Sequence, residues 1–169
     1  MGRYNGRVRF RIRDSHKQDF EQLWKLDQEC FPPGISYTRL ELAFYMRRPR
    51  AFTLVAESES AQAEAGGAIL GFIVGETSAR GAGHIITIDV GAEARRHRVG
   101  SALLQAAEER ARQRGSRHIF LETAVNNGAA IAFYKRHGYE LIKTIPRYYK
   151  DNLDALLLGK RLTPGAGSC

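Results

Sequence analysis

An arginine-rich stretch separates a run of β-branched residues from a helical pattern. The run His84–Val90 predicts a central strand, and the helix is predicted to begin near Val99. Between them stand Arg95, Arg96 and Arg98. The first N–H groups of a helix have no partners within it and lie at the positive end of its dipole. Phosphate groups bind at such helix starts, so the junction indicates an anion site, with a pyrophosphate as the expected group.

Two common phosphate-binding patterns are absent at this junction. The sequence has no GxxxxGK[ST] match, and GxGxxG does not follow the strand. Gly100 would let a ligand approach the backbone closely. An ordinary strand–helix turn with solvated arginines fits the same residues. The residues alone leave these two interpretations evenly balanced.

The junction resembles motif A of the GNAT superfamily of N-acetyltransferases, whose pattern is Gln/Arg-x-x-Gly-x-Gly/Ala; the matching stretch is Arg95–Leu104. Leu121–Tyr134 is similar to the second conserved block of that superfamily, and Gly138-Tyr139 is similar to its Gly-Phe/Tyr. Within the superfamily the chain looks most like the RimI-type ribosomal-protein alanine acetyltransferases. The shared features are the spacing of three residues and a later Tyr-Tyr pair, here Glu122, Asn127, Tyr134 and Tyr148-Tyr149.

One position departs from motif A. Arg98 replaces its first glycine. A non-glycine residue is sterically allowed in a first helical turn. We therefore expect binding to survive, with Arg98 either crowding the pyrophosphate or pairing with it.

The resemblance implies that acetyl-CoA is the co-substrate and that no metal is needed. It would lie in a gap where two parallel strands, 84–90 and 118–123, splay apart. Backbone groups of Ile88, Asp89 and Val90 would hold the pantetheine arm, and Asn127 would contact it. The residues implied at the pyrophosphate are Arg95, Arg96, His97, Arg98, Val99, Gly100 and Ser101.

The resemblance also implies the catalytic groups. The acceptor amine attacks the thioester directly and must be neutral, which is easier for an α-amine, of pKa about 7.7–8.0, than for a lysine, of about 10.4. Glu122 would be the general base, acting through water, and Tyr134 would protonate the departing CoA thiolate. Taken alone, Glu122 could simply make a cross-strand pair, and Tyr134 could be a core tyrosine.

Two loops are the expected walls for the acceptor. They are Phe31–Tyr37, with Phe31, Pro32 and Tyr37, and Arg147–Tyr149, with Tyr148 and Tyr149. Tight turns anchored by aromatic residues would look the same. The remaining histidines, His84 among them, show no metal-ligand spacing with Cys30.

The elements predicted around these residues follow the order β-α-α-β-β-β-α-β-α-β-β. Periodicity and breakers predict strands at 7–13, 51–57, 68–75, 84–90, 118–123, 139–145 and 155–162. The predicted helices cover about 20–30, 39–48, 99–114 and 129–137. On the third helix Val99, Leu103 and Leu104 share the buried face, whereas Glu108 is placed mostly on the outer face. The fold class is therefore α/β, with a mixed sheet.

Composition adds bounds on the class of protein. The 169 residues predict a single domain over 1–162 and a disordered tail over 163–169, and the polar stretch 58–67 is expected to form a turn. No apolar run reaches the roughly 18 residues of a membrane span. Two cysteines without a CxxC pair suggest a reduced, cytoplasmic setting. The formal charge of +8 suits either nucleic-acid phosphates or a smaller anionic ligand.

Three functions remain open at this point. The leading one is acetyl transfer from acetyl-CoA to the N-terminal α-amine of a peptide or protein, with possible ribosome association. The second is acetylation of a small amine or a lysine side chain. The third is a basic RNA- or ribosome-binding module without catalysis, for which Glu122, Asn127 and Tyr134 would not be needed together. The sequence leaves the oligomeric state open.

Overall fold

The computed structural model describes residues 8–59 and 67–164. Most of the turn expected at 58–67, and the tail beyond residue 164, lie outside the described residues. The described residues form one seven-stranded sheet in the order β1-β2-β3-β4-β5-β7-β6. The strands are β1 Phe10–Asp14, β2 Ala51–Ser58, β3 Ile69–Thr77, β4 Ala82–Val90, β5 His118–Ala124, β6 Glu140–Ile145 and β7 Ala155–Arg161.

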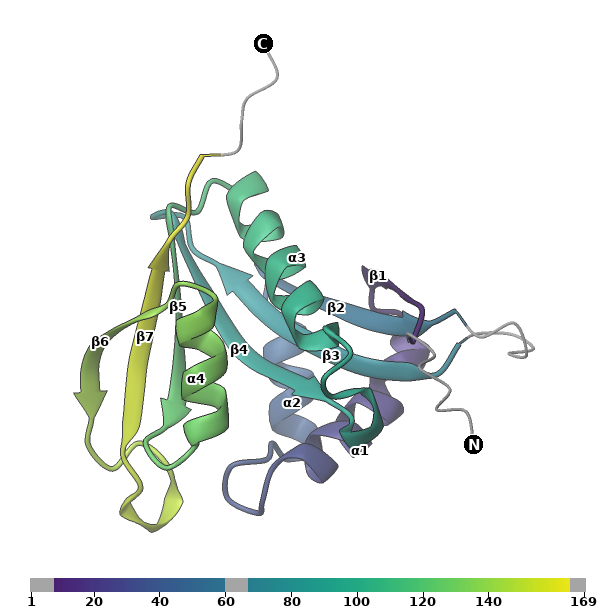
Figure 1. The fold of residues 1–169 in the computed structure, drawn as a ribbon, viewed down its shortest axis with the longest axis horizontal. Helices are drawn as coiled ribbons and strands as arrows, with labels where there is room; N and C mark the ends of the chain where they lie inside the picture. The colour runs from purple at the N-terminus through teal and green to yellow at the C-terminus, as the bar shows by residue number, and fades with distance from the viewer. Residues whose placement is uncertain (1–7, 60–66, 165–169) are drawn as a thin grey trace, which may run out of the picture.

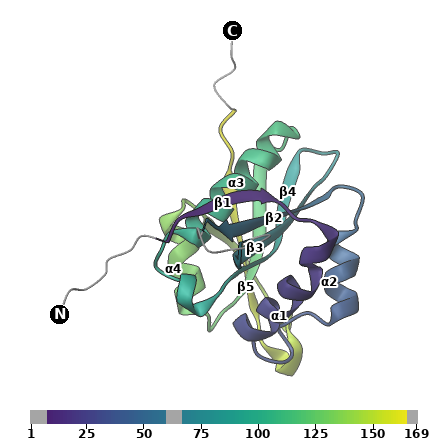
Figure 2. The same cartoon turned by 90° about the vertical axis from the view of Figure 1, so that its right-hand side faces the viewer.

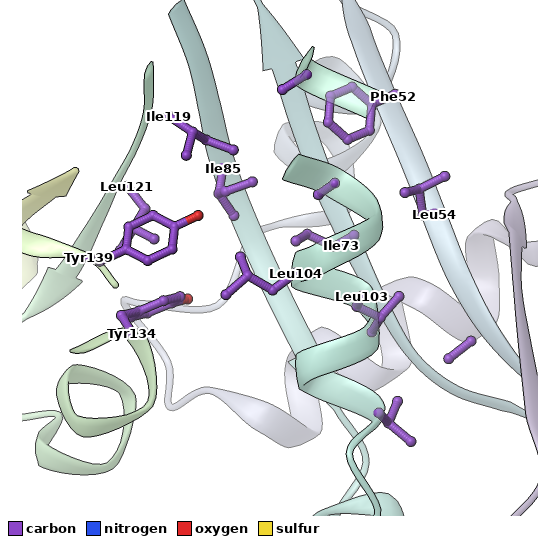
Figure 3. Packing of buried hydrophobic residues seen from close by; sticks show 14 of the residues in the cluster. Phe52, Leu54, Ile73, Ile85, Leu103, Leu104, Ile119, Leu121, Tyr134 and Tyr139 are labelled. Carbon is purple, nitrogen blue, oxygen red and sulfur yellow. The ribbon is translucent and has the colours of Figure 1, made fainter. Parts of the chain in front are cut away.

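Four α-helices cover the two faces of the sheet (Figures 1 and 2). They are α1 Phe20–Cys30, α2 Arg39–Met46, α3 Val99–Gln113 and α4 Gly128–Arg136, with short 3₁₀ turns at Lys17–Asp19, Ala92–Ala94 and Lys150–Asn152. One buried cluster lies between the sheet and α3 and α4, where Figure 3 shows Leu103 and Leu104. A second cluster joins α1 and α2 to the sheet through Leu23, Leu26 and Leu42. The predicted order of elements and the mixed α/β class are confirmed.

A β-bulge bends β4 at the point where the site forms. Along β3, Val74 pairs with Thr87 and Gly75 pairs with Ile85, which leaves Ile86 as the extra residue. A bulge of this kind sharpens the local twist and bends its strand. The only parallel pair in the described sheet, β4 with β5, ends just before it, at His84 opposite Phe120. The two central strands therefore separate beyond residue 84, as the resemblance implies.

The bulge also exchanges the faces to which the β4 side chains point. Ile85, before the bulge, belongs to the cluster under α3, and Ile88 and Val90 after it pack against the same cluster. By alternation Asp89 then points to the α1 face. A strand without the bulge would have directed Asp89 into the apolar core under α3.

Helix α3 shows the predicted buried face, with one correction. Val99, Leu103 and Leu104 are all buried as expected. Glu108, predicted on the outer face, is buried as well. Its carboxylate accepts hydrogen bonds from the Tyr139 hydroxyl (3.1 Å) and from Lys160 Nζ (3.0 and 3.1 Å). These partners come from distant segments, which explains why helical periodicity alone places Glu108 wrongly.

None of the described helices is long and apolar enough to cross a membrane.

Candidate active site

A cleft of about 780 Å³ opens where β4 and β5 separate. That volume lies within the range of about 300–1,000 Å³ found for ligand sites. Its walls come from β4, β5, the start of α3, α4 and two loops. The predicted site residues that line it are Phe31, Pro32, Tyr37, Ile88, Asp89, Val90, Arg95, Arg96, Arg98, Val99, Gly100, Ser101, Glu122, Asn127, Tyr134 and Tyr149.

One end of the cleft is the start of α3, which no side chain caps. By contrast, Thr38 caps α2, where it accepts from the Glu41 N–H, and Asn127 caps α4, where it accepts from the Ala130 N–H. The first N–H groups of α3, on Val99, Gly100 and Ser101, therefore have no partner within the helix and lie at its positive end. Together with the arginines that line the cleft, this is a site for an anion such as a pyrophosphate.

Arg98 does not lie in the first helical turn, so that expectation is wrong. It precedes α3 as the N-cap residue, in the left-handed region with φ 63°. Arg96 is also left-handed, with φ 66°. Left-handed backbone costs a non-glycine residue roughly 1–2 kcal/mol. The motif glycine is therefore the residue that this backbone favours, and Arg98 occupies its place at an energetic cost.

The β4 edge provides backbone groups along the floor of the cleft. The Ile86 carbonyl accepts from the Tyr37 hydroxyl (3.3 Å), and the Val90 carbonyl accepts from Arg95 Nε (3.2 Å). Both carbonyls therefore point away from β3, and by alternation Ile88 directs its N–H and C=O the same way. An extended amide chain could pair there as an added strand. His97, predicted at the pyrophosphate, is exposed and does not line the cleft.

Glu122 makes the cross-strand pair that was its alternative interpretation, with His84, a partner that the sequence interpretation did not name. Glu122 Oε2 lies 2.7 Å from His84 Nε2, and His84 Nδ1 lies 3.6 Å from Glu76 Oε1. Burial disfavours the charged imidazole, but the hydrogen bonds and charges of Glu122 and Glu76 outweigh it and raise the pKa of His84. The signal was available in the sequence, since the two residues lie on neighbouring strands. Their contact nevertheless depends on the register in which β4 and β5 pair.

Tyr134 lies under the cleft in the wall formed by α4. Its ring packs edge-to-face against Phe133 (5.2 Å) and Tyr139 (5.6 Å), and Figure 3 shows the two tyrosines beside Leu104 and Leu121. Burial, with a further contribution from the charge of Asp89, raises the pKa of the Tyr134 phenol. The phenol is therefore protonated at neutral pH and can donate a hydrogen bond.

Two loops meet at the other end of the cleft. Gly34, with φ +95°, lies so close to the second loop that a Cβ on it would be 3.5 Å from Lys150 Cβ. Tyr37 and Tyr149 line the cleft from the two loops, whereas Tyr148 does not. Tyr148 instead packs edge-to-face on Tyr149, with ring centroids 4.9 Å apart. The two predicted walls are thus brought together beside Glu122, which lines the same cleft.

Two buried carboxyl groups lie beside this end. Asp27 of α1 accepts from the Tyr37 N–H (2.8 Å) and from Gln28 Nε2 (3.1 Å), which fixes the first loop. Asp89 accepts from the Thr87 hydroxyl (3.1 Å). Burial raises the pKa of Asp27 to about 6, with a smaller contribution from the charge of Glu41. Burial also raises the pKa of Asp89 well above its usual range, with a smaller contribution from the charge of Asp27.

Cysteine and metal chemistry find little support in the described part of the chain. Burial, and secondarily the charge of Asp89, raises the pKa of the Cys30 thiol to about 11, so the thiolate is scarce at neutral pH. Among residues 8–59 and 67–164 no group of three or more His, Cys, Asp or Glu side chains could hold a metal ion.

Known proteins are similar to this chain in both sequence and fold. Residues 20–139 match the acetyltransferase (GNAT) family. An uncharacterized N-acetyltransferase of Methanocaldococcus jannaschii is 33% identical, over 89% of this chain and 90% of that protein. An N-alpha-acetyltransferase of Sulfurisphaera tokodaii is 27% identical, over 90% of this chain and 93% of that protein. The crystal structure of Ard1 from Thermoplasma volcanium has a TM-score of 0.81 and 26% identity, covering 92% of this chain and 99% of that one.

Proposed function

The chain belongs to the acetyltransferase (GNAT) family, and we propose that its acceptor is the α-amine at the N-terminus of a peptide or protein. The enzyme is an N-acetyltransferase and acetyl-CoA is its donor. The main support for this acceptor is that the loops Phe31–Tyr37 and Arg147–Tyr149 meet at the end of the cleft. An extended peptide can lie between Tyr37 and Tyr149, with its amine directed toward Glu122.

Residues at the other end of the cleft fit acetyl-CoA. The uncapped start of α3 and Arg98 would hold its pyrophosphate. The free edge of β4 at Ile88 and the side chain of Asn127 would hold the pantetheine amides. Asn127 uses its carbonyl oxygen to cap α4, so the amide N–H₂ is the group left for the ligand. Acetyl-CoA supplies a thioester whose carbonyl carbon the neutral amine attacks.

Glu122 and His84 would together remove the proton from the acceptor amine. An α-ammonium has an ordinary pKa of about 7.7–8.0 and must lose a proton before the amine can attack. The imidazole of His84 lies 2.7 Å from Glu122 and has a raised pKa, and its neutral form can take the proton that Glu122 relays through water. The base is therefore a pair of residues.

Tyr134 would act on the departing sulfur. An ordinary thiol has a pKa of about 8.5 and a tyrosine phenol about 10, and burial raises the latter further. Complete proton transfer from Tyr134 to the thiolate, the role that the resemblance implies, is thus unfavourable, and we propose a hydrogen-bonding role in its place. A hydrogen bond from the phenol would stabilise the thiolate as it forms, and the amine proton would neutralise it at the end.

The subfamily, the ribosome association and the cellular location of the enzyme belong to this proposal as well. The narrower similarity to RimI-type enzymes, ribosome association and a cytoplasmic location stay predictions, because the relatives named above carry the broader description. The roles of Glu122, Tyr134 and the other predicted site residues are likewise part of the proposal.

A panel of acceptors tests the proposed function. Release of free thiol from acetyl-CoA would be measured with peptides bearing a free N-terminus, with the same peptides N-terminally blocked but containing lysine, and with small amines. We expect turnover with the free N-termini and little with the blocked peptides. Turnover confined to lysine peptides or small amines would overturn the proposed acceptor, and no turnover with any of them would contradict the catalytic arrangement.

A further inference from the structure

One end of the sheet concentrates arginine side chains. It is formed by the connections α2–β2, β3–β4 and α3–β5 and by the end of β7, all at the end opposite to the start of α3 (Figure 1). Six exposed arginines come from these segments, and we call them the arginine end: Arg47, Arg50, Arg80, Arg114, Arg117 and Arg161.

Hydrogen bonds and strand pairing hold these segments together. Arg114 Nη1 donates to the Arg50 carbonyl (3.0 Å), which ties the end of α3 to the start of β2. The Arg117 N–H donates to the Gly81 carbonyl (2.8 Å), next to Arg80. His118, the neighbour of Arg117, pairs with Arg161 between β5 and β7. Four segments far apart in the sequence therefore present their arginines at one place.

Nearby carboxylates do not neutralise this charge. Glu76 pairs with Arg48 (3.1 Å), and Glu109 pairs with Arg112 (2.9 Å). Within the described part of the chain, none of the six arginines forms an ion pair. Arginines at the C-terminal ends of helices can stabilise the helix dipole, but that explains only Arg47, the C-cap of α2, and Arg114, the C-cap of α3. Arg80, Arg117 and Arg161 lie on other segments.

The chemistry of the arginine end selects a class of partner. All six cations are guanidinium groups, which bind phosphate oxygens in a bidentate way that lysine cannot reproduce. A membrane surface usually also requires apolar side chains for insertion. The large exposed apolar residues are Leu40, Phe44, Val125, Leu141, Ile142 and Tyr148, and none lies in the connections that form the arginine end. The geometry therefore favours a nucleic-acid backbone over a bilayer.

We propose that the arginine end binds RNA through its phosphate backbone. Helix α3 runs from the cleft to this end and, with 15 residues, is about 22 Å long. Bound RNA would therefore leave the acceptor loops open, so the enzyme could acetylate a peptide while it is held on an RNA-containing particle. The binding itself does not depend on which amine is the acceptor.

Fluorescence anisotropy with a labelled RNA duplex of about 16 base pairs tests this proposal. The variant replaces Arg80, Arg117 and Arg161 with glutamine. A matched control replaces Lys17, Lys25 and Lys143, three exposed cations elsewhere, and lowers the formal charge equally. We expect the arginine variant to flatten the slope of log K against log salt by about 2–3, since each lost phosphate contact removes about 0.7–0.9. The lysine control should keep most of the slope.

Acetyl transfer to a free peptide is measured for each protein, and it should be unchanged in both variants because none of these residues lines the cleft. Equal losses of RNA binding in the two variants would attribute binding to net charge alone and overturn the proposal. No binding of wild-type protein to RNA at low salt would also overturn it. So would binding that depends on the arginine end with phosphatidylserine vesicles but not with RNA.

Discussion

At the scale of single residues, the least expected contact is the one between Glu122 and His84. The resemblance directs attention to Glu122 alone, whereas the fold supplies a second titratable group 2.7 Å away. Burial lowers the pKa of His84, but the hydrogen bonds and charges of Glu122 and Glu76 outweigh it and raise that pKa. The pH dependence of turnover is therefore where their joint role becomes visible.

Glu122→Gln should lower kcat/KM by about 100-fold or more at neutral pH. The loss should be greatest at low pH, where the amine is protonated and a base is needed, and should shrink above the amine pKa of about 8. The measurement is kcat/KM against pH for both proteins with one peptide. Glu76→Gln is the matched control, because Glu76 contacts the same imidazole from farther away, at 3.6 Å. Parallel profiles for Glu122→Gln and wild type would rule out the proposed base.

Tyr134→Phe should lower kcat by about 100-fold while the affinity for acetyl-CoA is kept. The ring still fills its place between Phe133 and Tyr139, and only the hydrogen bond to the leaving sulfur is lost. Tyr139→Phe is the control, since its hydroxyl bonds to Glu108 and it does not line the cleft. Calorimetry with acetyl-CoA and single-turnover kinetics separate binding from chemistry. An unchanged kcat in Tyr134→Phe would remove this residue from the mechanism.

Asp27→Asn should make the protein more stable at pH 7–8. The pKa of Asp27 is about 6 in the folded protein, against about 3.9 when unfolded. Between about pH 4 and pH 6 the folded state thus binds more protons than the unfolded state. The contribution of Asp27 to stability is present below about pH 4 and is lost as pH rises through 6. Asparagine can still accept from the Tyr37 N–H.

The gain should therefore grow between pH 4 and 6 and reach about 1–3 kcal/mol. Urea unfolding across this pH range measures it. Asp27→Ala, which loses the bond to the Tyr37 N–H, should be destabilised and should raise KM for the peptide. A gain from asparagine that is equal at pH 4 and pH 8 would contradict the buried-charge explanation.

At the scale of elements, Glu108 links α3 to β7 and to the end of α4. Glu108→Ala should reduce the free energy of unfolding by about 2–4 kcal/mol, because it leaves the Tyr139 hydroxyl and Lys160 without their partner. Glu108→Gln keeps an acceptor for Tyr139 and should cost less. Chemical denaturation of the three proteins at pH 7 compares them. A smaller loss for alanine than for glutamine would show that this buried group is not held by its hydrogen bonds.

The same element shows what sequence patterns can and cannot predict. The period of α3 identifies Val99, Leu103 and Leu104 as buried, because helical spacing is a local property. Glu108 is placed wrongly since its partners lie 31 and 52 residues away. The bulge at Ile86 and the left-handed conformation of Arg98 could not be predicted either, because alternation and motif spacing do not specify backbone dihedral angles.

At the scale of the whole molecule, the order of strands and helices and the mixed sheet follow from the sequence. The resemblance implied that Asn127, Tyr134 and Tyr149 belong to one site, and in the structure all three line the same cleft. The charge of +8 suited either nucleic-acid phosphates or a smaller anionic ligand, and the fold places arginines at two separate sites. Four of the arginines line the cleft, at positions 95, 96, 98 and 136, and six others form the arginine end.

Hydrogen exchange should divide the free protein into two regions. β4 and β5 pair over only three residues, and β5–β7 lie beyond that seam. We expect the amides of β5–β7 to exchange faster than those of β2 and β3, because the smaller half can open by itself. Mass spectrometry of deuterium uptake measures this, with acetyl-CoA added as the second condition. Uniform protection across the seam without ligand would contradict it.

Because β4 and β5 pair over a short stretch, the stability of the sheet should depend on the concentration of acetyl-CoA. The proposed donor site spans both halves, with Ile88 on β4 and Asn127 beyond β5. A ligand that binds only when β4 and β5 are paired stabilises that paired state by about 2.7 kcal/mol when its concentration is a hundred times its dissociation constant. When acetyl-CoA is scarce, the halves part more often, and cellular proteases would meet the opened chain more frequently. The supply of acetyl groups would then govern the lifetime of the enzyme as well as its rate.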